Sequence, residues 1–174
     1  MDNVILEDLA GHIQDHCGLE CRISRALENP GYAYDEKRSQ YDSKRILKHL
    51  IETFPPDTLR LIGVTDVDLF VPILKYVYGL AQIEGECALI SIYRLRPQFY
   101  EQPFNQGILL SRVEKTALHE LGHTFGLTHC RDRRCVMHSS TRIKDTDFKH
   151  PNFCQTCLEL LHWHLKRSKK PLHP

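Results

Sequence analysis

Five residues in the second half of the chain have the types and spacing of a metal-dependent catalytic site: His119, Glu120, His123, Gly126 and His129. Residues four apart on a helix project from one face, so His119 and His123 can bind one ion. Neutral imidazole nitrogens suit zinc. Gly126 can adopt a positive φ, which would end the helix sharply and bring His129 back as a third ligand. A fourth position would remain for water.

Glu120 follows the first histidine and would lie beside the ligand pair, not on it. Zinc lowers the pKa of a bound water to about 7, and a neighbouring carboxylate can take the proton that this water releases. The same carboxylate can pass the proton to a leaving amine. The pattern therefore predicts a zinc metallopeptidase that hydrolyses peptide bonds with Glu120 as the general base. Incidental histidines on a helix are the alternative, but five residues at fixed spacing rarely match by chance.

A second set of metal-binding side chains begins at the next residue, with one methionine among them: Cys130, Cys135, Met137, Cys154 and Cys157. Together with the histidine motif, this order resembles the archaemetzincins, a family of metzincin zinc peptidases. Segments 34–41 and 63–70 are also similar to that family, so the resemblance spans most of the chain.

The resemblance implies a metzincin-type zincin fold of the α/β (α+β) class. Such a fold has a twisted mixed sheet backed by helices and a small C-terminal part. It implies two zinc ions per chain. The catalytic ion would be held by His119, His123 and His129, and Met137 would form the Met-turn under it, although an ordinary core methionine is the alternative. The structural ion would be held by Cys130, Cys135, Cys154 and Cys157.

Physical chemistry agrees with a thiolate site, because soft sulfur ligands suit a closed zinc tetrahedron and the binding energy would help a loop-rich region to fold. A redox Cys-x-x-Cys pair, two disulfides or free buried thiols remain open.

Two features depart from the wider metzincin pattern. Some metzincins place a tyrosine two residues after the methionine to stabilise the oxyanion, but Ser139 stands there and no tyrosine follows Tyr100. Any such helper must come from elsewhere. In addition, Cys130 directly follows His129, so the two predicted zinc sites are adjacent along the chain.

The elements that must position these residues fit one compact domain of 174 residues. We divide it into an N-terminal α/β part with the active-site helix (1–126) and a C-terminal part with the third histidine, the Met-turn, the four cysteines and a final helix (127–174).

Apolar periodicity predicts four helices: near 5–17, from Ser43 as N-cap to 53, over 108–125 and around 158–165. Strands are expected at 20–26 and 61–64 and as a hairpin of 76–83 with 87–92, while 32–42 and 94–107 are expected to be loops. By analogy with the family fold, 87–94 is the expected edge strand for an extended substrate.

Other residues have simpler interpretations. Small buried thiols are expected at Cys17, Cys21 and Cys87. His138 is expected to lie in a solvated loop. The same is expected of three arginines near the metal ligands, for which recognition of an acidic substrate group is the alternative: Arg131, Arg133 and Arg134. Asp66 and Asp68 are expected to be turn or loop anchors.

Composition limits the alternatives. Hydrophobic residues make up 41% and charged residues 26%, which excludes a disordered chain, and a net charge of +1 gives no drive toward nucleic acid or membrane. No membrane-length apolar run or secretory signal is visible, so we expect a cytoplasmic monomer that acts on peptides or proteins. The alternatives are a catalytically weak zinc scaffold that binds peptides or a protein partner, and a nucleic-acid module built on the four cysteines.

Overall fold

The computed structural model describes residues 3–24 and 28–168. Its α-helices are α1 (Asn3–Cys17), α2 (Ser43–Glu52), α3 (Gln106–Thr124), α4 (Ile143–Phe148) and α5 (Gln155–Ser168). Its strands are β1 (Tyr34–Asp35), β2 (Gln40–Asp42), β3 (Leu61–Thr65), β4 (Leu69–Phe70), β5 (Gly79–Ala81) and β6 (Cys87–Ser91). Three short 3-10 helices lie at Pro30–Ala33, Tyr93–Leu95 and Pro97–Tyr100. The expected α+β class with mixed sheets is confirmed.

The main sheet has the strand order β3-β6-β5. β3 runs parallel to β6, and β5 runs antiparallel to it, with Leu80 opposite Leu89. All five residues of β6 are buried, because this strand has a neighbour on each side and a helix over each face. The expected edge strand at 87–94 is therefore wrong: β6 is central, and β3 and β5 are the two edge strands.

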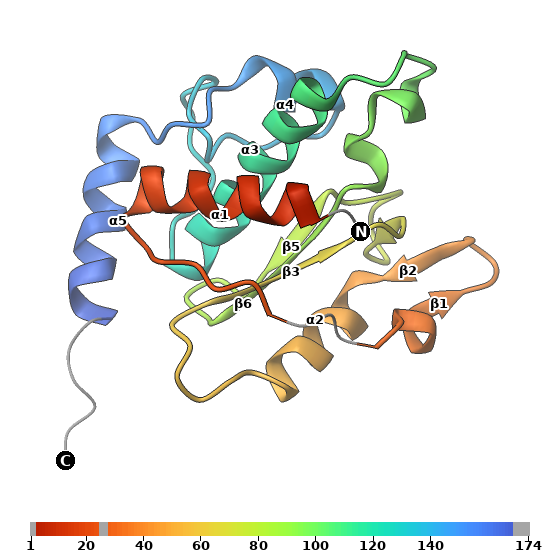
Figure 1. The fold of residues 1–174 in the computed structure, drawn as a ribbon, viewed down its shortest axis with the longest axis horizontal. Coiled ribbons are helices and arrows are strands. Elements are labelled where there is room, and N and C mark those ends of the chain that lie inside the picture. The colour runs from red at the N-terminus through yellow and green to blue at the C-terminus, as the bar shows by residue number, and fades with distance from the viewer. Residues whose placement is uncertain (1–2, 25–27, 169–174) are drawn as a thin grey trace.

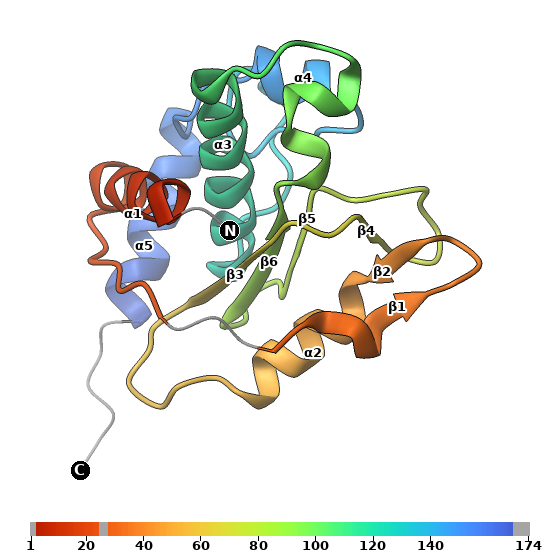
Figure 2. The same ribbon diagram turned by 45° about the vertical axis from the view of Figure 1, so that its right-hand side comes forward.

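Helices cover both faces of this sheet, with α3 on one side and α2 on the other (Figure 2). Ile90 and Ile92 pack toward α3, whereas Cys87 and Leu89 pack toward α2, as the two-residue period of a strand requires. α1 lies across α3 and packs against it, and α5 stands beside them (Figure 1). The catalytic-motif helix is thus held between the sheet and α1.

Most of the long elements agree with the sequence-based expectations. α1 ends at Cys17, and Gly18 follows it with φ +63°. α3 covers the predicted 108–125 helix, the 76–92 hairpin is formed, and α5 begins at the second cysteine pair. Cys87 is buried in the core as expected, and Cys17, the last residue of α1, is buried as well.

The short elements differ. The expected strand at 20–26 is not formed over 20–24, where Cys21 is partly buried and the other four residues are exposed. Residues 25 and 26 lie outside the described part. The expected loop at 32–42 holds the β1–β2 hairpin, whose two- and three-residue strands are too short to show a period. The N-cap of α2 is Asp42, which accepts from Lys44 N–H at 2.9 Å. Ser43 instead donates to the Phe70 carbonyl oxygen at 2.7 Å.

Asp68 is the loop anchor that its position suggested. Its carboxylate accepts two bonds from the Arg94 guanidinium at 2.6 and 2.7 Å and one from Gln40 at 3.0 Å. These bonds join β2, the segment after β3 and the segment after β6. Among the described helices, none is long and apolar enough to span a bilayer.

Candidate metal and catalytic site

α3 brings His119 and His123 to one face, where their Nε2 atoms lie 3.2 Å apart. Each Nδ1 lies against a backbone carbonyl oxygen: 2.9 Å to Val136 for His119 and 2.7 Å to Leu127 for His123. A carbonyl only accepts, so each Nδ1 must carry the hydrogen. Each Nε2 is then unprotonated and carries a free lone pair, so that both atoms can bind the same metal ion.

The turn after α3 brings His129 to this pair. Gly126 has φ +83°, and the N–H groups of Gly126 and Leu127 donate to the carbonyls of His123 and Gly122. This pair of bonds is the Schellman arrangement that ends many helices at glycine. The ring of His129 stacks on that of His119 with centroids 5.2 Å apart, and one nitrogen from each of the three histidines lies within 4.8 Å of the others.

The three histidines fit a zinc ion. A tetrahedral ion with bonds of about 2.1 Å separates its ligand nitrogens by about 3.4 Å, close to the distance between the first two. Burial, together with the nearby Lys149 ammonium, holds the pKa of His119 well below its ordinary value. Burial lowers the pKa of His123 and His129 in the same direction. All three are therefore neutral near pH 7, which is the form that binds metal.

Glu120 lies beside this cluster under the edge strand. An added Cβ at Gly79 of β5 would meet Glu120 Cγ at 2.7 Å and Oε1 at 2.8 Å, so only glycine leaves room for the carboxyl group. Burial raises the pKa of Glu120 to about 8, and the Lys149 ammonium opposes that shift. A carboxyl group with a pKa near neutrality can both accept and return a proton.

Met137 and Lys149 are buried next to the segments that carry the histidines. Met137 is fully buried, and its Sδ packs so closely on Gly122 of α3 that an added Cβ there would collide with it. Lys149 is 3% exposed and donates to the carbonyls of Val136 at 2.9 Å and His138 at 3.0 Å. It therefore holds the same Val136 carbonyl that orients His119. Sequence reasoning misses Lys149, because a lysine in a polar segment is normally solvated.

The four predicted cysteines also come together. The Sγ atoms of Cys130 and Cys154 lie 3.7 Å apart, near the ~3.8 Å edge of a zinc–thiolate tetrahedron with bonds of about 2.3 Å. All four sulfurs lie within 4.8 Å of one another, and Cys154 N–H donates to Cys135 Sγ at 3.3 Å. None of the seven cysteines forms a disulfide, so that alternative is not found. A set of four also differs from an isolated redox pair.

The other residues singled out in the sequence, among them His138, Arg133 and Cys21, belong to neither metal-binding cluster. His138 is not free, since its Nδ1 lies 2.8 Å from the Cys130 carbonyl oxygen. It lines a surface pocket of about 200 Å³ with Arg133, Lys144, Asp145 and Phe148. The Arg133 guanidinium lies over the Phe148 ring at 5.2 Å. Cys21 bonds weakly to the Leu19 carbonyl oxygen and joins no metal-binding group.

Comparisons with known proteins agree with this geometry. Residues 13–163 match the model of peptidase family M54. The chain is 43% identical over 141 residues to the archaemetzincin of Methanocaldococcus jannaschii, covering 81% of this chain and 76% of that protein. The crystal structure of the Methanopyrus kandleri archaemetzincin matches with a TM-score of 0.85 and 36% identity, over 95% of this chain and 88% of that one. A zinc-dependent peptidase from Methanocorpusculum labreanum matches with a TM-score of 0.82 and 27% identity, over 91% and 93%.

Proposed function

The chain belongs to peptidase family M54, the archaemetzincins, and is a zinc metallopeptidase; on this premise we propose that Glu120 is its general base and that His119, His123 and His129 hold the catalytic zinc. The observation that supports this assignment is the convergence of the two Nε2 lone pairs 3.2 Å apart, with Glu120 next to them on the same helix. Membership of a peptidase family favours this function over a binding scaffold or a nucleic-acid module.

When bound, zinc supplies a water of lowered pKa and polarises the carbonyl under attack. Glu120 takes the proton from the attacking water and returns it to the leaving amine. Its burial keeps the carboxylate poorly solvated and therefore basic, with a pKa of about 8. The backbone carbonyls of Val136 and Leu127 keep the histidine rings in place while this proton moves.

The substrate would bind along β5 as an added strand. The Tyr78 carbonyl and the Gln82 N–H bond to β6, so by the alternation of an antiparallel pair the polar groups of Gly79 and Ala81 face the free edge. A peptide paired there would pass next to Glu120, which lies against Gly79. β5 replaces the 87–94 segment as the strand that receives the substrate.

The second part of the proposal concerns the four cysteines, which would hold a structural zinc and so, with the catalytic ion, account for two ions per chain. Met137 would be the Met-turn floor under the histidines. The proposed boundary at residue 126 then falls inside the catalytic site, because His123 precedes it and His129 follows it. We keep a cytoplasmic monomer as the prediction for location and assembly.

The test is cleavage of a diverse peptide pool, read by mass spectrometry, with zinc content measured on the same samples. Glu120→Gln keeps the shape of the side chain but cannot accept the proton, so we expect cleavage to fall by about 10²- to 10⁴-fold with bound zinc unchanged. The matched control is Glu86→Gln, at an exposed position before β6. Equal cleavage by Glu120→Gln and the parent would disprove the assigned base.

A further inference from the structure

A third group of metal-binding side chains lies away from both clusters, where α1 crosses α3. His12 and His16 are one turn apart on α1, and both face Glu114 of α3. Glu114 Oε1 lies 3.1 Å from His12 Nδ1 and 3.0 Å from His16 Nε2. One donor atom from each of the three side chains lies within 4.8 Å of the others, as in the histidine group at His119 and the cysteine group at Cys130.

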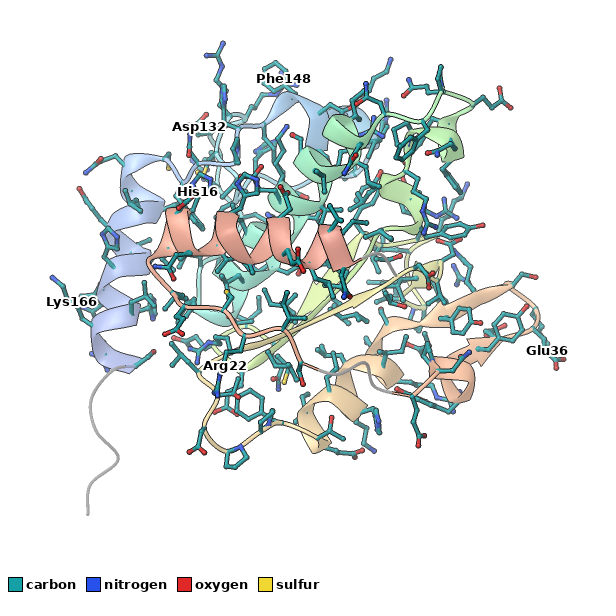
Figure 3. The ribbon with its side chains drawn as sticks, in the orientation of Figure 1. His16, Arg22, Glu36, Asp132, Phe148 and Lys166 are labelled. Carbon is teal, nitrogen blue, oxygen red and sulfur yellow. The ribbon has the colours of Figure 1, made fainter. Side chains whose placement is uncertain are left out.

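The burial of this group suits a site that a cation can enter from one side. Only 9% of the Glu114 side chain is exposed, whereas the side chains of His12 and His16 are 37% and 21% exposed. The carboxylate thus lies at the base and the imidazoles at the rim. Figure 3 shows His16 at the end of α1 on the side that faces α3.

The two ring nitrogens of His12 both face carboxylates. Its Nδ1 lies against Glu114, and its Nε2 lies 3.5 Å from Asp8 Oδ2. A neutral imidazole has a single N–H, so one of these contacts would set a nitrogen lone pair against a carboxylate oxygen. A cation between His12 Nδ1 and Glu114 removes this repulsion and leaves the N–H for Asp8. That order, carboxylate–histidine–metal, is the usual outer arrangement of protein metal sites.

We propose that His12, His16 and Glu114 form a further zinc site that joins α1 to the catalytic helix. Two imidazoles and one carboxylate are a known zinc ligand set, and a water completes the tetrahedron on the exposed side. Other borderline cations such as Co²⁺ and Ni²⁺ bind such a set as well. Glu114 precedes His119 by five residues, about 7.5 Å along the helix axis, so the ion would brace α3 near its catalytic end.

The experiment counts zinc per chain in the full protein after equilibrium dialysis at a fixed, buffered free zinc concentration. The informative variant is His16→Gln, because glutamine keeps an N–H that can donate to Glu114 but is a poor zinc ligand. Gln14→Ala, at an exposed position on the same helix, is the matched control. We expect three zinc ions in the parent and in Gln14→Ala, and two in His16→Gln.

A second measurement is the rise in thermal unfolding midpoint on adding zinc to protein that already holds its tighter ions. This late rise is expected in the parent and in Gln14→Ala, and is expected to be lost in His16→Gln. If His16→Gln fails to fold, His12→Gln removes a different ligand of the same site and has the same expected count. Equal zinc counts in the parent and in the folded variant would overturn the proposal, because the group would then be a hydrogen-bonded contact only.

Discussion

The histidine cluster and the cysteine cluster follow each other directly along the chain, yet the fold builds them differently. His119 and His123 come from one long helix, and His129 reaches them through a glycine turn and stays exposed. The cysteines come from loops and from the start of α5, and Cys135 and Cys157 are buried. One cluster has a rigid frame and an open side, whereas the other has four donors and a closed interior.

This difference explains why a zinc ion in the histidine cluster would serve catalysis and one in the cysteine cluster would serve stability. An open position next to a base is what hydrolysis needs, and groups of the protein itself, the helix and two backbone carbonyls, hold the histidine rings. The region after Gly126 has little regular structure before α5, so four sulfurs would supply much of its cohesion. Loss of the first site should stop catalysis, and loss of the second should lower the stability of the fold.

The largest effect is expected for Cys157→Ser. Zinc binding at a structural site contributes directly to folding, so we expect the free energy of unfolding to fall by several kcal/mol, on the order of what a lost structural metal costs. Cys21→Ser is the control, because that thiol joins no metal-binding group. Thermal denaturation of the two variants measures the difference, and equal midpoints would contradict a structural role for the four cysteines.

The converse change is His129→Ala. Here we expect cleavage of the peptide pool to fall at least about 100-fold, because the zinc loses one of three ligands. The unfolding midpoint should fall far less than in Cys157→Ser, since His129 is exposed and its loss leaves α3 intact. Thr128→Ala, the neighbouring exposed position, should cleave like the parent. A His129→Ala protein as unstable as Cys157→Ser would remove the distinction between the clusters.

A smaller effect tests the frame around the base. In Gly79→Ala the new methyl group would meet Glu120 Cγ at 2.7 Å and the Leu89 carbonyl oxygen at 2.8 Å. The backbone contact cannot be relieved by a rotamer change, so we expect about 1–3 kcal/mol of destabilisation and a displaced carboxyl group. Gly107→Ala, whose Cβ would meet nothing closer than 3.5 Å, is the control. Unchanged stability and cleavage in Gly79→Ala would show that β5 does not pack on the base.

The smallest effect concerns pH. The Lys149 ammonium lowers the pKa of Glu120 and of the three histidines, so replacing it by methionine should raise all four. The base must be deprotonated and the ligands neutral, so activity rises with pH through these pKa values. In Lys149→Met the acidic limb of the kcat/KM profile should therefore move to higher pH, by about one unit or less. A shift to lower pH would contradict the assigned electrostatics.

Residue spacing was enough to predict both clusters and the helix that carries the first. His119 and His123 are four apart, Gly126 has the positive φ that the motif requires, and α5 begins between Cys154 and Cys157. Such features depend on local geometry, which a single sequence records well.

Features set by tertiary packing could not be predicted in the same way. The expectation of an edge strand at 87–94 fails, because alternation does not tell a central strand from an edge one; β6 is central, and β3 and β5 lie at the edges. The role of Lys149 depends on carbonyls 11 and 13 residues away. The group at Glu114 needs α1 and α3 to cross, with partners 98 residues apart. Each of these features depends on which surfaces of the fold pack together, and no short sequence pattern encodes that packing.

The central claim is that the histidine site serves catalysis and the cysteine site serves stability. It is tested most directly by a chelator titration in which two signals are followed on one sample. Peptide cleavage reports on the histidine cluster, and fluorescence of Trp163, the single tryptophan, reports on α5 beside the cysteines. We predict that cleavage is lost at low chelator concentration while the Trp163 emission stays unchanged until much stronger chelation. Loss of both signals together, or loss of the Trp163 signal first, would contradict the account.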